Sequence, residues 1–179
     1  MSDVPVLEKL DWAARLLFAQ GVLFGLLVLN LIGFAIPYTG EIRPMFVLMA
    51  VYYWAIYRPT LVPPFVVFAL GIVMDIISDY PLGMNAFVLL AVQWSVRRQR
   101  VFLMGQSYGM VWIGWAAVCA LAACLHWLLF SLFSWQVISP QPAISSVILS
   151  IGLYPLVTLI LIGVHRILPV ASGPFRSVR

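Results

Sequence analysis

Residues Gly71 to Gly83 read GIVMDIISDYPLG and place an aspartate, Asp75, inside a run of apolar side chains. A carboxylate at the centre of a membrane-spanning helix costs about 2.5 to 3.5 kcal/mol, so it normally has a partner or a function. Asp75 lies four residues before Asp79, where we expect the helix to end, so it lies about 6 Å inside that end. We therefore expect a smaller cost, and a side chain that accepts hydrogen bonds from a loop, a neighbouring helix or a partner protein.

The composition around this stretch is that of an integral membrane protein. Hydrophobic residues make up 64% of the 179 positions and charged residues 9%, and the mean hydropathy is +1.06. A soluble globular domain carries about 25% charged residues. We therefore expect one all-α, polytopic membrane domain over residues 1–179, embedded in a lipid bilayer. The net charge of +4 is explained by basic cytoplasmic loops, and no nucleic-acid partner is expected.

Charges, prolines and turn residues divide the chain into six apolar segments, each read as a transmembrane helix. The segments cover residues 16–36, 44–57, 61–78, 82–96, 108–133 and 143–165. The second is short for a hydrocarbon core of about 30 Å, so it is expected to borrow from its flanks or to lie in a locally thinned bilayer. The fourth is expected to stop at the RRQR run of Arg97 to Arg100, and Pro155 is expected to kink the sixth.

The basic residues predict the orientation of these six helices. With both termini in the cytoplasm, all ten Lys and Arg residues except Arg43 lie on the cytoplasmic side. Cytoplasmic loops are enriched in Lys and Arg. The sequence thus predicts six spans with an N-in, C-in topology.

The SDYPLG segment, Ser78 to Gly83, is predicted to be a tight turn at the outer membrane surface. We expect Ser78 or Asp79 to cap the next helix and Pro81 to lie in its first turn.

Two carboxylates on one helix face, Asp75 and Asp79, raise the possibility of an aspartyl membrane protease. Such enzymes bring their acids from different helices, whereas both acids here come from one helix and its end. His126 is expected to be a hydrogen-bonded packing residue, since no nucleophile motif surrounds it. Phosphate loops, metal-ligand clusters and dinucleotide fingerprints are absent from the sequence. We therefore expect no enzyme activity, no cofactor and no metal.

The region from Ile42 to Val96 resembles the rod shape-determining protein MreD family. The family pattern has an Arg-Pro before the second helix, an aromatic pair, a second basic-Pro turn, a Gly-xxx-Asp-hydrophobic-hydrophobic-Ser stretch and a Leu-Gly turn. The matching positions are Arg43, Pro44, Tyr53, Trp54, Arg58, Pro59, Gly71, Asp75, Ser78, Leu82 and Gly83. These positions other than the aromatic pair, together with Asp79 and Pro81, form the candidate partner-binding or structural motif.

The resemblance implies a non-enzymatic, multi-pass subunit of the bacterial inner (cytoplasmic) membrane that serves the cell-elongation machinery. Members of this family look like partners of the bitopic protein MreC. Through MreC they would act with MreB, RodA and a class B penicillin-binding protein in lateral peptidoglycan synthesis and cell shape. The family fold is similar to the substrate-binding subunits of energy-coupling-factor transporters, so a small-molecule-binding transport subunit is the alternative. Asp75 is then expected to fix the Ser78–Gly83 turn as a docking surface for a partner.

Overall fold

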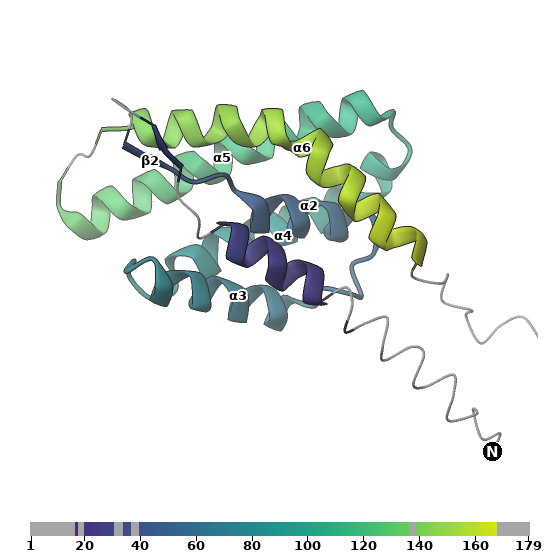
Figure 1. Ribbon diagram of the computed structural model, residues 1–179, viewed down its shortest axis with the longest axis horizontal. Coiled ribbons are helices and arrows are strands. Elements are labelled where there is room, and N and C mark those ends of the chain that lie inside the picture. The colour runs from purple at the N-terminus through teal and green to yellow at the C-terminus, as the bar shows by residue number, and fades with distance from the viewer. Residues whose placement is uncertain (1–16, 18–19, 31–33, 37–39, 137–138, 168–179) are drawn as a thin grey trace, which may run out of the picture.

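The computed structural model describes residues 17, 20–30, 34–36, 40–136 and 139–167, and within them the fold is a bundle of helices with one short β-hairpin (Figure 1). A first helix, Gln20–Asn30, precedes the hairpin. The remaining elements are β1 (Phe34–Ile36), β2 (Gly40–Ile42), α2 (Phe46–Tyr57), α3 (Pro64–Ile77), α4 (Met84–Met104), α5 (Tyr108–Ser134) and α6 (Gln141–Ile167).

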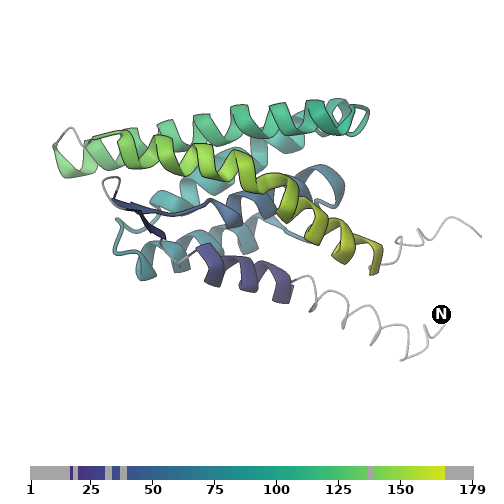
Figure 2. The same cartoon turned by 45° about the horizontal axis from the view of Figure 1, so that its top comes forward.

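The fold is helical apart from this hairpin, as expected, but β1 occupies residues where the first helix was expected to continue to Ile36. Strands β1 and β2 pair antiparallel, with Phe34 opposite Ile42 and Ile36 opposite Gly40. In the sequence, Gly33 and Pro37 flank β1, and both residue types disfavour a helix. The predicted turn over residues 37–40 lies mostly outside the described residues. The hairpin lies beside α6 (Figure 2).

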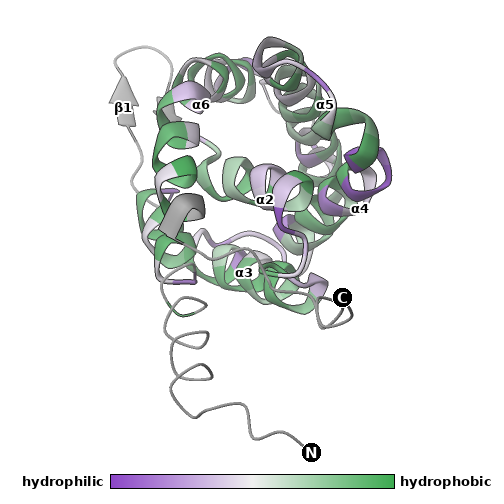
Figure 3. Ribbon diagram, turned by 90° about the vertical axis from the view of Figure 1, so that its right-hand side faces the viewer, coloured by the Kyte–Doolittle hydropathy of each residue, from purple (hydrophilic) through white to green (hydrophobic). Residues whose placement is uncertain are grey.

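Helix α2 is the centre of the molecule. Every residue from Phe46 to Ile56 is buried, and Figure 3 shows α2 inside a ring formed by the other helices. A helix that is apolar all round belongs in such a core. Its 12 residues extend only about 18 Å. Protein surrounds the helix, so its shortness requires neither borrowed flanks nor a thinned bilayer.

The amino-terminal end of α2 is satisfied by side chains from two other helices. Met45 donates its backbone N–H to Ser150 Oγ at 2.9 Å, and Val47 donates to Asn30 Oδ1 at 3.3 Å. The first N–H groups of a helix have no partner within it, and unpaired groups are costly away from water. These bonds hold α2 between the first helix and α6.

Helix α4 begins and ends later than predicted. It starts at Met84 rather than Leu82, and it continues through the RRQR run to Met104. Within this run, Arg98 lies over Trp94, one turn earlier, with its guanidinium 3.9 Å from the ring centre. Charged side chains are compatible with helix, so the end of the apolar run is not the end of α4.

Two other arginines of the run bind the connection between α2 and α3. Arg97 Nη2 donates to the carbonyl oxygens of Pro59 at 2.5 Å and Val62 at 3.0 Å, and Arg100 Nε donates to Ile56 O at 2.7 Å. Carbonyls at a helix end and in a turn have few backbone donors. Arg97 and Arg100 therefore fix this connection onto α4.

Helix α6 contains a proline, Pro155, and bends along its length (Figure 1). Tryptophans of α5 supply hydrogen bonds to carbonyl groups near this proline. Pro155 has no N–H, so the carbonyl of Ile151, four residues earlier, lacks its helical donor. Trp112 Nε1 donates to Ile151 O at 3.1 Å, and Trp115 Nε1 donates to Ser150 O at 3.3 Å. The two indoles thus pair carbonyl groups around the proline and join α5 to α6.

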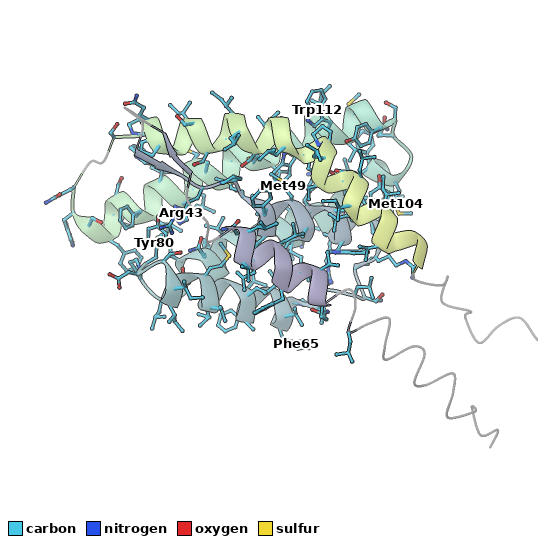
Figure 4. The ribbon with its side chains drawn as sticks, in the orientation of Figure 1. Arg43, Met49, Phe65, Tyr80, Met104 and Trp112 are labelled. Carbon is cyan, nitrogen blue, oxygen red and sulfur yellow. The ribbon has the colours of Figure 1, made fainter. Side chains whose placement is uncertain are left out.

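The outward faces of the bundle are apolar. Large hydrophobic side chains are exposed on α3, α5 and α6, and Phe65 points away from the bundle in Figure 4, 72% exposed. Two helices, Tyr108–Ser134 and the Gln141–Val164 part of α6, are long and apolar enough to cross a membrane. The first helix, α2 and α3 are apolar but shorter. Apolar outer surfaces of this extent are typical of contact with lipid or protein.

Candidate functional site

The side chain of Asp75, on α3, caps the amino terminus of helix α4. It is fully buried on α3, and its Oδ2 accepts the backbone N–H of Gly83 at 2.9 Å. Its Oδ1 accepts both the backbone N–H of Asn85 at 2.9 Å and the side-chain Nδ2–H at 2.8 Å. A carboxylate at a helix amino terminus is favoured by the helix dipole and by the unpaired N–H groups there. Asp75 therefore supplies the side-chain acceptor that the N-cap residue of α4, Gly83, cannot provide.

The main chain of Asp75 also ends helix α3. Tyr80 donates its N–H to the Asp75 carbonyl at 3.0 Å, and Asp79 between them has a positive φ of 57°. This is the hydrogen-bond pattern of a Schellman helix end, in which a left-handed residue follows the C-cap. Ser78 is that C-cap. One residue thus terminates α3 with its carbonyl and starts α4 with its carboxylate.

This geometry corrects the predicted cap of the fourth helix. The N-cap of α4 is Gly83, with φ 94°, a conformation that glycine adopts without steric cost. Neither Ser78 nor Asp79 caps α4, and Pro81 precedes the helix rather than lying in its first turn. The reason is that a cap can come from outside the local sequence, and Asp75 lies eight residues before Gly83.

Gly71 lets α3 and α4 approach closely one turn below Asp75. A Cβ atom built on Gly71 would lie 2.2 Å from Ala86 Cα and 2.5 Å from Ala86 N. Both contacts are to backbone, which cannot move aside without separating the helices. The Gly-xxx-Asp spacing therefore places the close approach and the cap on the same face of α3.

Arg43 connects the hairpin to the same turn. Its Nη1 donates to Ser78 Oγ at 3.2 Å, and Figure 4 shows Arg43 and Tyr80 at the same end of the bundle, opposite Met104. Pro44, which follows, is buried and its carbonyl accepts the N–H of Phe46 at 3.0 Å.

The structure brings most of the predicted motif together but separates its two Arg-Pro pairs. Arg43 and Pro44 precede α2, whereas Arg58 and Pro59 follow it, so the pairs lie about 18 Å apart along the helix axis. The group at the α3–α4 end of the bundle contains Arg43, Pro44, Asp75, Ser78, Asp79, Pro81, Leu82 and Gly83. Within that group Asp79 is exposed and Leu82 is 72% exposed.

A cavity of about 390 Å³ lies beside the turn, between the start of α2, the α3–α4 turn and helices α5 and α6. Its polar lining includes Arg43, Ser78, Asn85, His126 and Ser146. The volume is in the range of small-molecule sites, about 300 to 1,000 Å³. Sequence reasoning did not single out Asn85 or Ser146, because isolated polar residues in apolar helices form no motif.

Tyr80 closes one side of this cavity. Its ring packs edge to face against His126, with centroids 5.2 Å apart, and against Phe130, with centroids 5.4 Å apart. Such aromatic pairs are favourable beyond their buried area. The turn is thus packed against α5 as well as hydrogen-bonded to α4.

The carboxylates of Asp75 and Asp79 do not form an opposed pair across a cleft. Both oxygens of Asp75 accept hydrogen bonds from the first turn of α4, whereas the side chain of Asp79 is exposed on the turn. In the part of the chain that the structure describes, no cluster of three or more His, Cys, Asp or Glu side chains could hold a metal ion.

Comparison with known proteins identifies the family. The model of the rod shape-determining protein MreD family matches residues 13–163. Searches of curated proteins and of solved structures gave no match. The family match ends at residue 163, four residues before the end of α6, and includes the whole Asp75 turn and the cavity beside it. The chain therefore belongs to the rod shape-determining protein MreD family, a membrane protein family that acts in cell shape.

Proposed function

We propose that this protein is a non-enzymatic, multi-pass subunit of the bacterial inner membrane that binds an MreC-like bitopic protein. In this role it supports lateral peptidoglycan synthesis and acts indirectly with MreB, RodA and a class B penicillin-binding protein. We further propose one membrane domain with six spans and both termini in the cytoplasm. The family match supports the role in cell shape, and the apolar outward faces of the helices support a position in lipid.

The Ser78–Gly83 turn carries the proposal of an assembly role. The three hydrogen bonds of Asp75 and the Schellman end of α3 fix its backbone, yet Leu82 within it is 72% exposed. Ile76 and Ile77, in the last turn of α3, are 65% and 55% exposed. A rigid surface loses little conformational entropy on binding. The turn and the end of α3 therefore suit the membrane end of a partner helix.

The experiment is affinity purification of the tagged protein from native membranes in mild detergent, followed by mass spectrometry. We expect a bitopic MreC-like protein with wall synthases, and a reduced yield of that partner with Leu82→Ala. Leu159→Ala is the matched control, because Leu159 is 68% exposed on α6. Equal partner recovery from both variants and the unchanged protein would contradict the docking role of the turn.

A second candidate function follows from the cavity. A small-molecule-binding membrane subunit of an energy-coupling-factor-type transporter needs a concave site with a few polar groups, and Arg43, Asn85 and His126 line such a space. Co-purification of an ATPase module, or retention of a vitamin-like ligand without wall synthases, would favour this alternative.

A further inference from the structure

A second, apolar cavity adjoins the one beside the turn. It has a volume of about 270 Å³, lies between α5 and α6, and is lined mainly by aliphatic side chains. Ala123, Trp127 and Ala143 line both cavities. The two spaces therefore meet at the seam between α5 and α6, where two of the three shared side chains are only a methyl group.

The two cavities differ in chemistry. The first contains the guanidinium of Arg43, the hydroxyl groups of Ser78 and Ser146 and the amide of Asn85. Guanidinium, hydroxyl and amide donors that share one space are suited to a phosphate oxygen. The second cavity offers almost no polar surface and suits a hydrocarbon chain.

The apolar cavity opens toward the outer surface of the bundle. Ile144 and Ile148 line it and are 56% and 67% exposed, as expected for side chains that face lipid. A space of this volume is too small for a partner helix of about 10 Å diameter. An acyl chain is the occupant that matches its apolar lining and its opening toward the outer surface.

We propose that the two cavities together bind one phospholipid molecule. The phosphate ester lies beside Arg43 and Asn85, and an acyl chain passes the seam at Ala123 and Ala143 into the groove between α5 and α6. Bound there, the lipid contacts the α3–α4 turn through its head group and the outer helices through its chain. This site is independent of the partner-binding role proposed above.

The first test compares three probes by native mass spectrometry of the full-length protein in detergent. Dioleoyl phosphatidylglycerol carries both parts of the ligand, dioleoylglycerol lacks the phosphate, and glycerol 3-phosphate lacks the chains. We expect the whole lipid to bind at least tenfold more tightly than either fragment. Equal binding of dioleoylglycerol would reduce the site to ordinary lipid contact, and equal binding of glycerol 3-phosphate would make it a site for a soluble anion; either result overturns the proposal.

The second test uses variants on each side of the seam. Arg43→Gln removes the charge and Ala143→Phe fills the seam, so each is expected to lower phosphatidylglycerol binding at least fivefold. The matched controls are Arg58→Gln, in the other Arg-Pro pair, and Ala117→Phe, an exposed alanine of α5 outside both cavities. Controls that lose binding as strongly as the seam and charge variants would refute the site.

A third variant serves if Arg43→Gln fails to fold, since Arg43 also binds Ser78. Ser146→Ala removes the hydroxyl from the polar cavity and changes the side chain by only that one heavy atom. It is expected to weaken phosphatidylglycerol binding severalfold without changing the weak binding of dioleoylglycerol. If Ser146→Ala weakens both probes equally, or neither, the phosphate is not bound in this cavity.

Discussion

Replacement of Asp75 by asparagine tests the central claim about the turn, because the two side chains have nearly the same shape. An asparagine oxygen at the Oδ1 position can still accept the two hydrogen bonds from Asn85. The amide nitrogen then takes the Oδ2 position and faces the N–H of Gly83, 2.9 Å away in the native protein. Two donors therefore point at one another at the start of α4.

The cost of this change can be worked from the three bonds. An unsatisfied buried N–H costs about 1 to 3 kcal/mol. The two remaining bonds lose their charge assistance, which roughly halves their strength, and the favourable charge at the helix terminus, about 0.3 to 1 kcal/mol, is lost as well. Relief of the cost of burying a charge offsets part of this loss. We expect Asp75→Asn to destabilise the fold by about 2 to 3 kcal/mol.

The assay is thermal unfolding of the purified protein in detergent, followed by tryptophan fluorescence. For a chain of this length 1 kcal/mol corresponds to about 2 to 4 °C, so Tm should fall by about 4 to 12 °C. Asp79→Asn is the matched control in the same turn. Asp79 is exposed and has φ 57°, a conformation that asparagine accepts readily. We expect Asp79→Asn to change Tm by less than about 2 °C.

Partner recovery and cell shape provide the functional measurement. If the turn is the docking surface, Asp75→Asn should reduce both the recovery of the bitopic partner and the complementation of rod shape, whereas Asp79→Asn should preserve both. A native Tm together with native partner recovery and shape in Asp75→Asn would refute the reasoning about the cap and about the turn.

Three further predictions follow from the packing. Gly71→Ala should destabilise the protein by about 1 to 3 kcal/mol or prevent folding, since its Cβ would overlap the backbone of α4; Gly163→Ala, which meets no atom within 4 Å, should leave thermal stability unchanged or raise it slightly. Trp112→Phe should lower the free energy of unfolding by about 1 kcal/mol in the native protein. The loss should be much smaller in a Pro155→Ala background, where the restored N–H of residue 155 donates to the Ile151 carbonyl. Equal losses in a double-mutant cycle would contradict the Trp112–Ile151 hydrogen bond. Arg97→Gln should release the connection between α2 and α3, measured as faster amide exchange in that connection while the core of α2 stays protected.

The sequence predicted the helical segments well where long apolar runs end at turn residues. Helices α5 and α6 begin and end within two residues of the predicted bounds. The third helix ends within one residue of the prediction but begins at Pro64 rather than Leu61, because Pro63 is its N-cap. The end of α4 lies beyond the predicted one, because the apolar run ends at RRQR but the helix does not: Arg97 and Arg100 remain helical and bind carbonyl groups elsewhere.

The hydrogen-bonding partners were beyond the reach of sequence reasoning. The need of Asp75 for a partner follows from the cost of a buried carboxylate, but nothing local indicates that Asn85, ten residues later, supplies two of its three bonds. The central position of α2 was missed for a similar reason. A short apolar helix in lipid and one buried in protein have the same composition, and only the packing of the other helices distinguishes them.

The polar side chains of the interior fall into two groups that differ in what they bind. Asp75, Asn30 and Ser150 pair N–H groups at helix starts, and Arg97 pairs carbonyl groups in a connection. In a membrane protein these bonds replace water, because irregular backbone is tolerated only where protein or a cavity supplies partners.

The second group lines the cavity beside the turn. Arg43, Ser146 and His126 line it, whereas other side chains pair the N–H groups at the starts of α2 and α4. These three side chains converge on one space that adjoins the rigid Ser78–Gly83 turn. A ligand held there would contact both the turn and the outer helices α5 and α6. Because Leu82, Ile76 and Ile77 do not line this cavity, a ligand there would leave the proposed docking surface uncovered.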